Sequence, residues 1–127
     1  MKNSKKIAVI TGGAGFIGSH MVDLLLSKKY KVNVIDNLSG GHKKNLTHHK
    51  KNSDLKFEKS DICKLKKTHK FFKNADFVFH FAGIGDIVPS IENPDNYMQT
   101  NIQGTVKVLE AARYNGIKKF VYSASAS

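Results

Sequence analysis

The sequence has a single cysteine, Cys63, among its 127 residues. One thiol cannot form a disulfide within the chain, which is typical of the reducing cytoplasm, where we expect this protein to act. No apolar run approaches the roughly 20 residues that a transmembrane helix needs. The two absences argue against a disulfide-stabilised secreted scaffold and against an integral membrane protein, so we expect no membrane partner.

Arginine is almost absent: Arg113 is the only one in the chain. The formal net charge of +11 therefore comes from lysine. Proteins that read nucleic acid commonly mix arginine with lysine, since a guanidinium group contacts phosphates and base edges through two parallel hydrogen bonds. The lysines here are spread over predicted helix faces and loops. We therefore expect a solvated basic surface and no nucleic-acid partner, with a charge that would attract an anionic nucleotide.

The sequence does contain apolar strand patterns that alternate with helical patterns. Its length suits one domain, 1–127, and this alternation predicts βαβ units in a parallel sheet. The expected strands are 6–11, 31–36, 55–59, 77–81 and 119–123, and the expected helices are 15–29, 62–73 and 94–115. We predict an α/β fold, a Rossmann-like doubly wound parallel sheet with strand order 3-2-1-4-5 that is truncated after strand five, so that 1–127 is an incomplete domain. Such a sheet binds ligands at the carboxyl ends of its strands, between strands one and four.

Two of the predicted helices have an apolar stripe at helical spacing, and we expect both stripes to be buried against the sheet. The stripes are Ile17, Met21, Leu24 and Leu25 in the first helix, and Met98, Ile102, Val106 and Leu109 in the last. The polar segment 37–54, which could include a helical turn, and the segment 82–93 are expected to be loops.

The most informative segment is the glycine-rich loop between the first strand and the first helix. Gly13, Gly15 and Gly18 have the spacing G-x-G-x-x-G, and Gly12, Gly15 and Gly18 are three residues apart. Such a loop lets backbone N–H groups approach a pyrophosphate, and the following helix N-terminus adds a favourable dipole. No lysine follows Gly18, so the segment is not a P-loop. It predicts a dinucleotide site.

Asp36 ends the second strand, about 20 residues beyond the glycine loop, where dinucleotide-binding folds have an acidic residue. A carboxylate there accepts hydrogen bonds from the adenosine ribose and repels a 2′-phosphate, which favours NAD over NADP. The same aspartate could simply begin the turn 36–40. The two roles are compatible.

Two further strand ends lie near the expected site. Asp61 follows the third strand, and spacing leaves open whether it caps the next helix or also contacts adenine. The segment 81–83 ends the fourth strand with small residues, which lets a cofactor lie close to the backbone. The serines in 123–127 follow the fifth strand, and their spacing alone predicts only a polar transition from this strand to a loop.

The histidines do not form a recognisable site. His80 lies within an apolar strand and is expected to be a hydrogen-bonded core residue. His48 and His49 are adjacent, so on a loop their side chains are expected to point apart, and we predict no metal site.

Taken together, the motifs resemble the extended short-chain dehydrogenase/reductase family, and within it the NAD-dependent epimerases and dehydratases of the UDP-glucose 4-epimerase type. The segments that carry the resemblance are 11–19, 36–40, 61–62, 80–83, Asn101-x-x-Gly104-Thr105 and 120–125. They occur in family order over nearly the whole chain.

The resemblance implies a role for each matched residue. The glycine loop, with Phe16 and Ile17, would cover the pyrophosphate of NAD, and Asn101 would order the site. Ser90 would contact the substrate, and Ser125 matches the catalytic Ser/Thr that binds the sugar hydroxyl. The predicted NAD-binding residues are Gly12, Gly15, Phe16, Ile17, Gly18, Asp36, Asn37, Ser39, Gly40, Asp61, Ile62, Phe81, Ala82, Gly83 and Asn101.

The implied reaction is reversible oxidation at C4 of a nucleotide sugar, with a UDP-sugar expected, through a 4-keto intermediate. The family's Tyr-x-x-x-Lys pair belongs after strand five, so we expect Tyr-x-x-x-Lys to be absent from this chain and the chain alone to be inactive. We interpret the chain as an amino-terminal fragment whose parent is a homodimer. A nucleotide-sugar 4,6-dehydratase and an NAD-binding module without catalysis remain alternatives.

Overall fold

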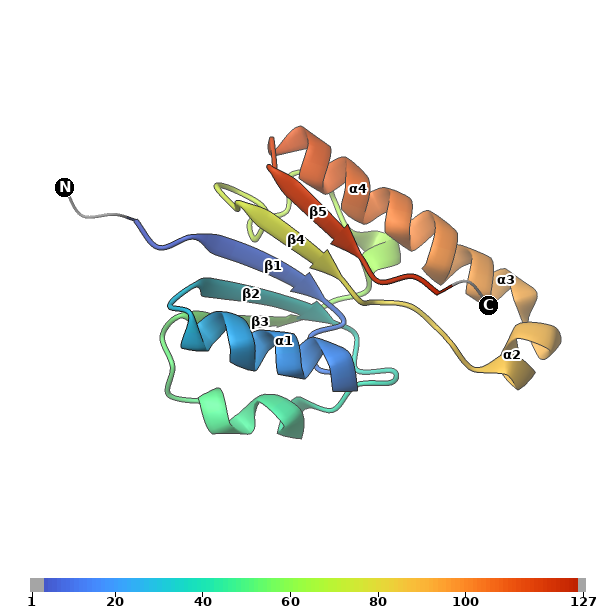
Figure 1. The fold of residues 1–127 in the computed structure, drawn as a ribbon. Coiled ribbons are helices and arrows are strands. Elements are labelled where there is room, and N and C mark those ends of the chain that lie inside the picture. The colour runs from blue at the N-terminus through green and yellow to red at the C-terminus, as the bar shows by residue number, and fades with distance from the viewer. Residues whose placement is uncertain (1–3, 126–127) are drawn as a thin grey trace.

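The computed structural model describes residues 4–125. Five strands form one parallel sheet in the order β3-β2-β1-β4-β5 (Figure 1). The strands are β1 (Ile7–Thr11), β2 (Lys31–Asp36), β3 (Leu55–Lys59), β4 (Phe77–His80) and β5 (Lys119–Tyr122). The predicted fold class and strand order are confirmed, and β2 and β3 have the predicted bounds.

The register brings the carboxyl ends of the three central strands together. Thr11, the last residue of β1, pairs with Ile35 of β2 and with His80 of β4. Backbone hydrogen bonds continue one residue further, from Gly12 N to Ile35 O at 2.8 Å and from Phe81 N to Thr11 O at 3.0 Å. The glycine loop therefore starts beside the ends of both neighbouring strands.

Helices cover both faces of the sheet. Helix α1 (Phe16–Ser27) and the 3-10 helix η1 (Lys43–His49) share one core with alternate β1 and β2 residues such as Ile10 and Val34. The other core joins Val9 and Val78 to the short 3-10 helix η2 (Ile62–Lys64) and to α4 (Thr105–Tyr114). No helix among residues 4–125 is long and apolar enough to cross a membrane.

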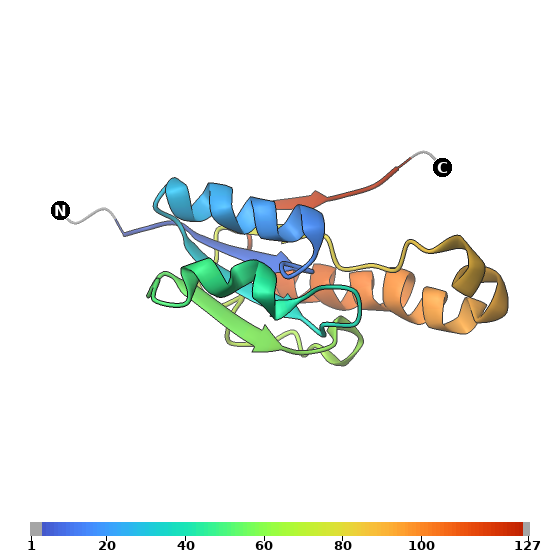
Figure 2. The ribbon, with the colours of Figure 1, turned by 90° about the horizontal axis from the view of Figure 1, so that it is seen from below.

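A long helix runs along the second face and extends past the sheet (Figure 2). It is continuous from α3 (Pro94–Tyr97) through a π-helical stretch, η3 (Met98–Gly104), into α4. A short helix, α2 (Ile87–Glu92), precedes it, in a segment expected to be a loop.

The predicted helix 62–73 is wrong beyond its first turn. Asp61 caps η2 by accepting a hydrogen bond from Cys63 N at 2.9 Å, but Leu65 is already extended, with φ −66° and ψ 131°. That conformation turns the chain so that Leu65, Phe71 and Phe72 all reach the core. Burial of these side chains outweighs the helical pattern of the segment.

The predicted stripes are also wrong in part. In α1, Ile17 and Leu24 are 58% and 47% exposed, and Val22 takes a buried place instead. On the long helix the whole expected stripe is exposed, because smaller residues face the sheet. The buried residues there are Gly104, Val108, Ala111 and Ala112, whereas Met98, Ile102, Val106 and Leu109 are 43% to 56% exposed.

Candidate dinucleotide site

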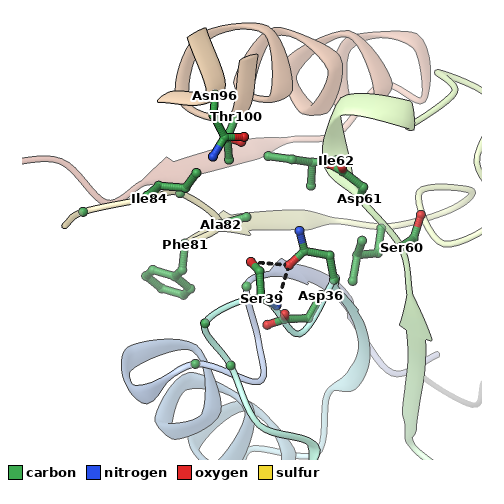
Figure 3. A pocket seen from close by; sticks show the side chains of 18 of the residues that line it. Asp36, Ser39, Ser60, Asp61, Ile62, Phe81, Ala82, Ile84, Asn96 and Thr100 are labelled. Atoms are coloured by element: carbon green, nitrogen blue, oxygen red, sulfur yellow. Dashed lines mark hydrogen bonds between the residues drawn. The ribbon is translucent and has the colours of Figure 1, made fainter. Parts of the chain in front are cut away.

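A pocket of about 540 Å³ lies where the carboxyl ends of β1, β2 and β4 meet (Figure 3). This volume is within the range of small-molecule and cofactor sites. The predicted NAD-binding residues that line it are Gly12, Gly15, Asp36, Asn37, Ser39, Gly40, Asp61, Ile62, Phe81, Ala82 and Gly83. The sequence motifs therefore converge on one cavity.

Several predicted residues lie outside the pocket lining. Phe16 and Ile17 are exposed in the first turn of α1. Ser90 lies on α2, where its hydroxyl donates to the carbonyl of Ile87 at 2.5 Å. Ser125 follows β5 and is exposed. The substrate-binding and catalytic roles of the two serines stay predictions.

The glycine loop owes its shape to contacts that no side chain could occupy. Gly12 has φ +70°, and a Cβ there would lie 2.7 Å from the backbone nitrogen of Ala82. A Cβ on Gly18 would lie 2.1 Å from the carbonyl oxygen of Gly12. These distances are far below van der Waals contact, so glycine is required for the loop to close against both α1 and β4.

The N-terminus of α1 begins at the pocket. Its N-cap is Gly15, a pocket-lining residue whose position provides no side-chain cap. The first N–H groups of a helix have no partner within the helix, and the helix dipole places partial positive charge there. The N–H groups at this end can therefore donate hydrogen bonds to the oxygens of a pyrophosphate.

Asp36 is held in a fixed orientation at the end of β2. It is 7% exposed; its Oδ2 accepts from Ala14 N at 2.9 Å and its Oδ1 accepts from Leu38 N at 2.7 Å. Each carboxylate oxygen has two acceptor sites, so one site on each remains for a ligand hydroxyl. Asp36 therefore begins the turn, as expected, and also lines the pocket, while its contact with the adenosine ribose stays a prediction.

The loop after Asp36 packs onto the glycine loop through Gly41, a pocket-lining residue that was not predicted. A Cβ on Gly41 would lie 2.7 Å from the carbonyl carbon of Ala14, whereas nothing lies within 4 Å of one on Gly40. The Gly-Gly doublet was the available signal, but spacing could not tell which glycine is enclosed. Asn37 stabilises this loop by accepting from Ser39 N at 2.9 Å and from Ser39 Oγ at 2.7 Å.

Asn101 positions the wall of the pocket after β4. Its Oδ1 accepts from Ile84 N at 2.8 Å and its Nδ2 donates to Ile84 O at 2.9 Å. It does not line the pocket, but Ile84 does. Ser60 and Thr100 also line the pocket and were not predicted, although each directly precedes a predicted residue.

His80 is a buried, fully hydrogen-bonded histidine, as predicted. Its Nδ1 lies 2.5 Å from Thr11 Oγ1 and its Nε2 lies 2.8 Å from Thr105 Oγ1. Thr105 Oγ1 donates to Asn101 O at 2.7 Å, so it accepts from His80 Nε2–H, and Nδ1 accepts from the Thr11 hydroxyl. Burial lowers the pKa of His80 to about 4 and keeps the ring neutral.

One Tyr-x-x-x-Lys spacing does occur, from Tyr114 to Lys118. Lys118 Nζ pairs with Asp76 Oδ1 at 3.1 Å, and Asp76 Oδ2 accepts from Ile7 N at the start of β1. Lys118 is therefore at the amino ends of the strands, at the opposite end of the sheet from the pocket. This spacing forms no part of the site.

Comparisons with known proteins agree with this geometry. The NAD dependent epimerase/dehydratase family matches residues 8–127. The bifunctional protein GAL10 of Kluyveromyces lactis is 38% identical over 96% of this chain. A UDP-N-acetylglucosamine 4-epimerase from Methanobrevibacter ruminantium, solved with UDP-N-acetylmuramic acid, is 39% identical with a TM-score of 0.89 over 97% of this chain.

A dehydratase of known structure is also similar. DesIV of Streptomyces venezuelae, a dTDP-glucose 4,6-dehydratase solved with NAD and TYD bound, is 32% identical with a TM-score of 0.82 over 90% of this chain. The chain spans 18% of GAL10 and 39% and 38% of the two structures. It thus corresponds to less than half of each protein.

Proposed function

The chain belongs to the NAD dependent epimerase/dehydratase family, and we propose that it is the NAD-binding portion of a nucleotide-sugar 4-epimerase. The observation that carries the proposal is the pocket, which the glycine loop borders on one side and Asp36 on another. The similarity to the UDP-N-acetylglucosamine 4-epimerase supports the choice of reaction, and UDP-sugars are the proposed substrates. We further propose that residues 1–127 are one Rossmann domain of a longer cytoplasmic protein.

The pocket residues divide among the parts of NAD. The N–H groups at the start of α1 would bind the pyrophosphate, and Asp36 would accept from both adenosine ribose hydroxyls. Asp61 and Ile62 would flank adenine, and the backbone of 81–83 would line the nicotinamide half. NAD bound there would supply a hydride acceptor and donor for reversible oxidation at C4 of the sugar.

The direct test of the cofactor assignment is calorimetric titration of the chain with NAD⁺ and with NADP⁺. We expect NAD⁺ to bind more tightly, and Asp36→Ala to weaken NAD⁺ binding at least tenfold and to remove the preference over NADP⁺, since hydrogen bonds to a charged group contribute about 1.5–3 kcal/mol each. Asp54→Asn is the matched control, because Asp54 pairs with Lys5 and lies outside the pocket lining. Unchanged affinity in Asp36→Ala would remove Asp36 from the site.

The catalytic assignment requires a longer protein. We propose that Ser125 hydrogen-bonds the sugar hydroxyl that is oxidised and that Ser90 contacts the substrate. We expect residues 1–127 alone to bind NAD⁺ but not to interconvert UDP-glucose and UDP-galactose, because the one Tyr-x-x-x-Lys spacing lies far from the pocket. Turnover by the isolated chain would contradict this.

A 4,6-dehydratase is the second candidate, and the similarity to DesIV favours it. Both reactions begin with oxidation at C4, so this half of the site serves either. The products separate them: an epimerase returns an isomer of equal mass, whereas a dehydratase releases water and leaves a 4-keto-6-deoxy sugar. Mass spectrometry of the nucleotide sugar after incubation with the longer protein decides between them.

We also propose that the longer protein is a homodimer through the exposed side of the long helix. Four apolar side chains lie along that side, those of Met98, Ile102, Val106 and Leu109. A two-fold pair of such helices would bury them. Val106→Asp is expected to yield monomers in light scattering, whereas Gln103→Glu, at a neighbouring exposed position, is the control. A dimer that survives Val106→Asp would contradict the proposed interface.

A further inference from the structure

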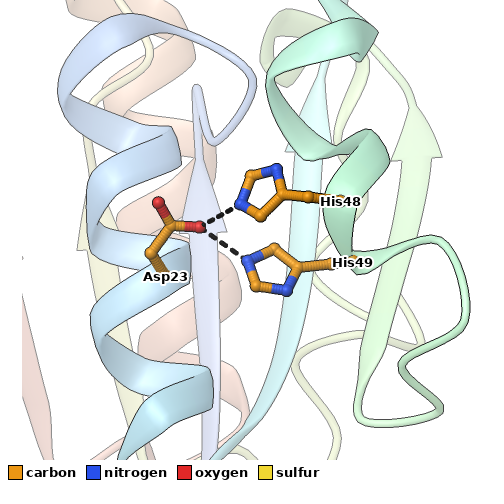
Figure 4. A group of neighbouring side chains, drawn as sticks. All are labelled: Asp23, His48 and His49. Atoms are coloured by element: carbon orange, nitrogen blue, oxygen red, sulfur yellow. Dashed lines mark hydrogen bonds and ion pairs between the residues drawn. The ribbon is translucent and has the colours of Figure 1, made fainter.

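Three side chains that could ligate a metal converge between α1 and η1, outside the dinucleotide pocket (Figure 4). His48 Nε2 and His49 Nε2 lie 2.7 and 2.6 Å from the same oxygen, Oδ1 of Asp23. Their ring centroids are 4.0 Å apart. The expectation that these adjacent histidines point apart is therefore wrong, because both side chains extend from the end of η1 towards α1.

The cluster is close to the geometry of a three-ligand metal site. Its three ligating atoms lie within 4.8 Å of one another. A metal bound at about 2.0–2.2 Å from each atom in tetrahedral geometry would separate them by about 3.4 Å. The two nitrogens would therefore move about 0.7 Å from the carboxylate oxygen to admit an ion. His20, whose Nδ1 is 4.0 Å from Asp23 Oδ2, is next to the site on α1.

The charge of the cluster suits a divalent ion. Asp23 is a carboxylate at neutral pH, because the ordinary pKa of an aspartate is about 3.9. Side-chain exposures of 55% for His48, 18% for His49 and 41% for Asp23 leave the site open to a hydrated ion.

The ligand set selects the kind of metal. Imidazole nitrogen suits zinc, copper and nickel, whereas magnesium and calcium prefer oxygen ligands throughout. Two imidazoles and one carboxylate from this cluster would leave at least one coordination position for water. We propose that Asp23, His48 and His49 bind a divalent transition-metal ion of the zinc type.

Such an ion would tie η1 to α1 near the dinucleotide pocket. At the other end of η1, His42 N and Asn45 Nδ2 already donate to Ala14 O, at 3.0 and 2.9 Å. The loop that enters η1 includes Ser39 and Gly41, which line the pocket. A metal that binds only the folded chain would also raise its stability by mass action.

The test is titration of the tag-free chain with zinc chloride, followed by calorimetry and thermal unfolding. We expect one zinc ion per chain and a higher melting temperature, with no effect of magnesium at the same concentration. The double variant His48→Gln/His49→Gln should bind zinc at least tenfold more weakly. His42→Gln is the matched control, because His42 is an exposed histidine next to η1 and outside the cluster.

A second measurement covers the case in which the double variant fails to fold. Electron paramagnetic resonance of the unmutated chain 1–127 with one equivalent of Cu²⁺ should show hyperfine coupling to two imidazole nitrogens. The variant His42→Gln should give the same spectrum. Failure of the parent to bind zinc, or zinc binding that the folded double variant retains, would overturn the proposal. A copper spectrum without two imidazoles would do the same.

Discussion

Acid should destabilise this protein through one buried side chain, His80. The ring is 0% exposed and is held as a neutral group between the hydroxyls of Thr11 and Thr105. Burial lowers its pKa from 6.5 to about 4. Between these two values the unfolded chain binds a proton that the folded chain does not, so stability rises with pH across the window and falls as pH drops from about 6.5 towards 4.

The magnitude follows from the size of the shift. One pKa unit corresponds to about 1.4 kcal/mol, so the full shift is about 3 kcal/mol, and about 2 kcal/mol of it is lost between roughly pH 7 and pH 5. That loss is a large part of the marginal stability of a domain of this size. The carboxyls with lowered pKa values, those of Asp23, Glu58 and Asp76, begin from 4.5 or less and add their effect only at lower pH.

Urea unfolding of the parent and of His80→Gln at several pH values measures this. We expect the unmutated chain to lose stability from near pH 7 to near pH 5. The variant His80→Gln should be less stable at every pH but nearly insensitive to pH in that range. His42→Gln, which removes an exposed histidine, should keep the dependence of the parent. Equal pH dependence in the parent and in His80→Gln would refute the argument, because the titrating group would then lie elsewhere.

Two other predictions concern residues that support the pocket from outside its lining. Gly18→Ala should destabilise the fold by about 1–3 kcal/mol and abolish NAD⁺ binding, since overpacking against backbone cannot relax cheaply; Gly40→Ala, where a Cβ has open space, should leave denaturant stability unchanged. Asn101→Ala should cost about 1–3 kcal/mol through its two lost hydrogen bonds to Ile84. It should also speed hydrogen exchange at the Ile84 amide, and unchanged exchange there would contradict the positioning role of Asn101.

Strand positions were predictable because β1, β2, β4 and β5 are short segments rich in β-branched and aromatic residues, whereas β3 alternates apolar and charged residues. The bounds of β2 and β3 are those predicted. The convergence of the motif residues on one pocket was predictable for a related reason: many of them directly follow those strands, and the carboxyl ends of parallel strands meet. What failed were features set by contacts between distant segments. The sequence could not show that Leu65 is extended or that Gly41, rather than Gly40, closes on Ala14.

The reversed face of the long helix shows that size, rather than hydrophobicity, decides which side is buried. A Cβ on Gly104 would lie 2.6 Å from Ile62 Cδ1, so the helix axis approaches η2 more closely than a large side chain permits. The small side chains of Val108 and Ala111 continue that contact along the same face. Larger apolar side chains such as Ile102 must then face away, although they form the clearer hydrophobic stripe. An amphipathic pattern predicts that a helix face will be buried, but it does not predict which surface will cover that face. On this helix the small residues pack against the domain, and the stripe of larger apolar side chains is left for the proposed contact with a second copy of the chain.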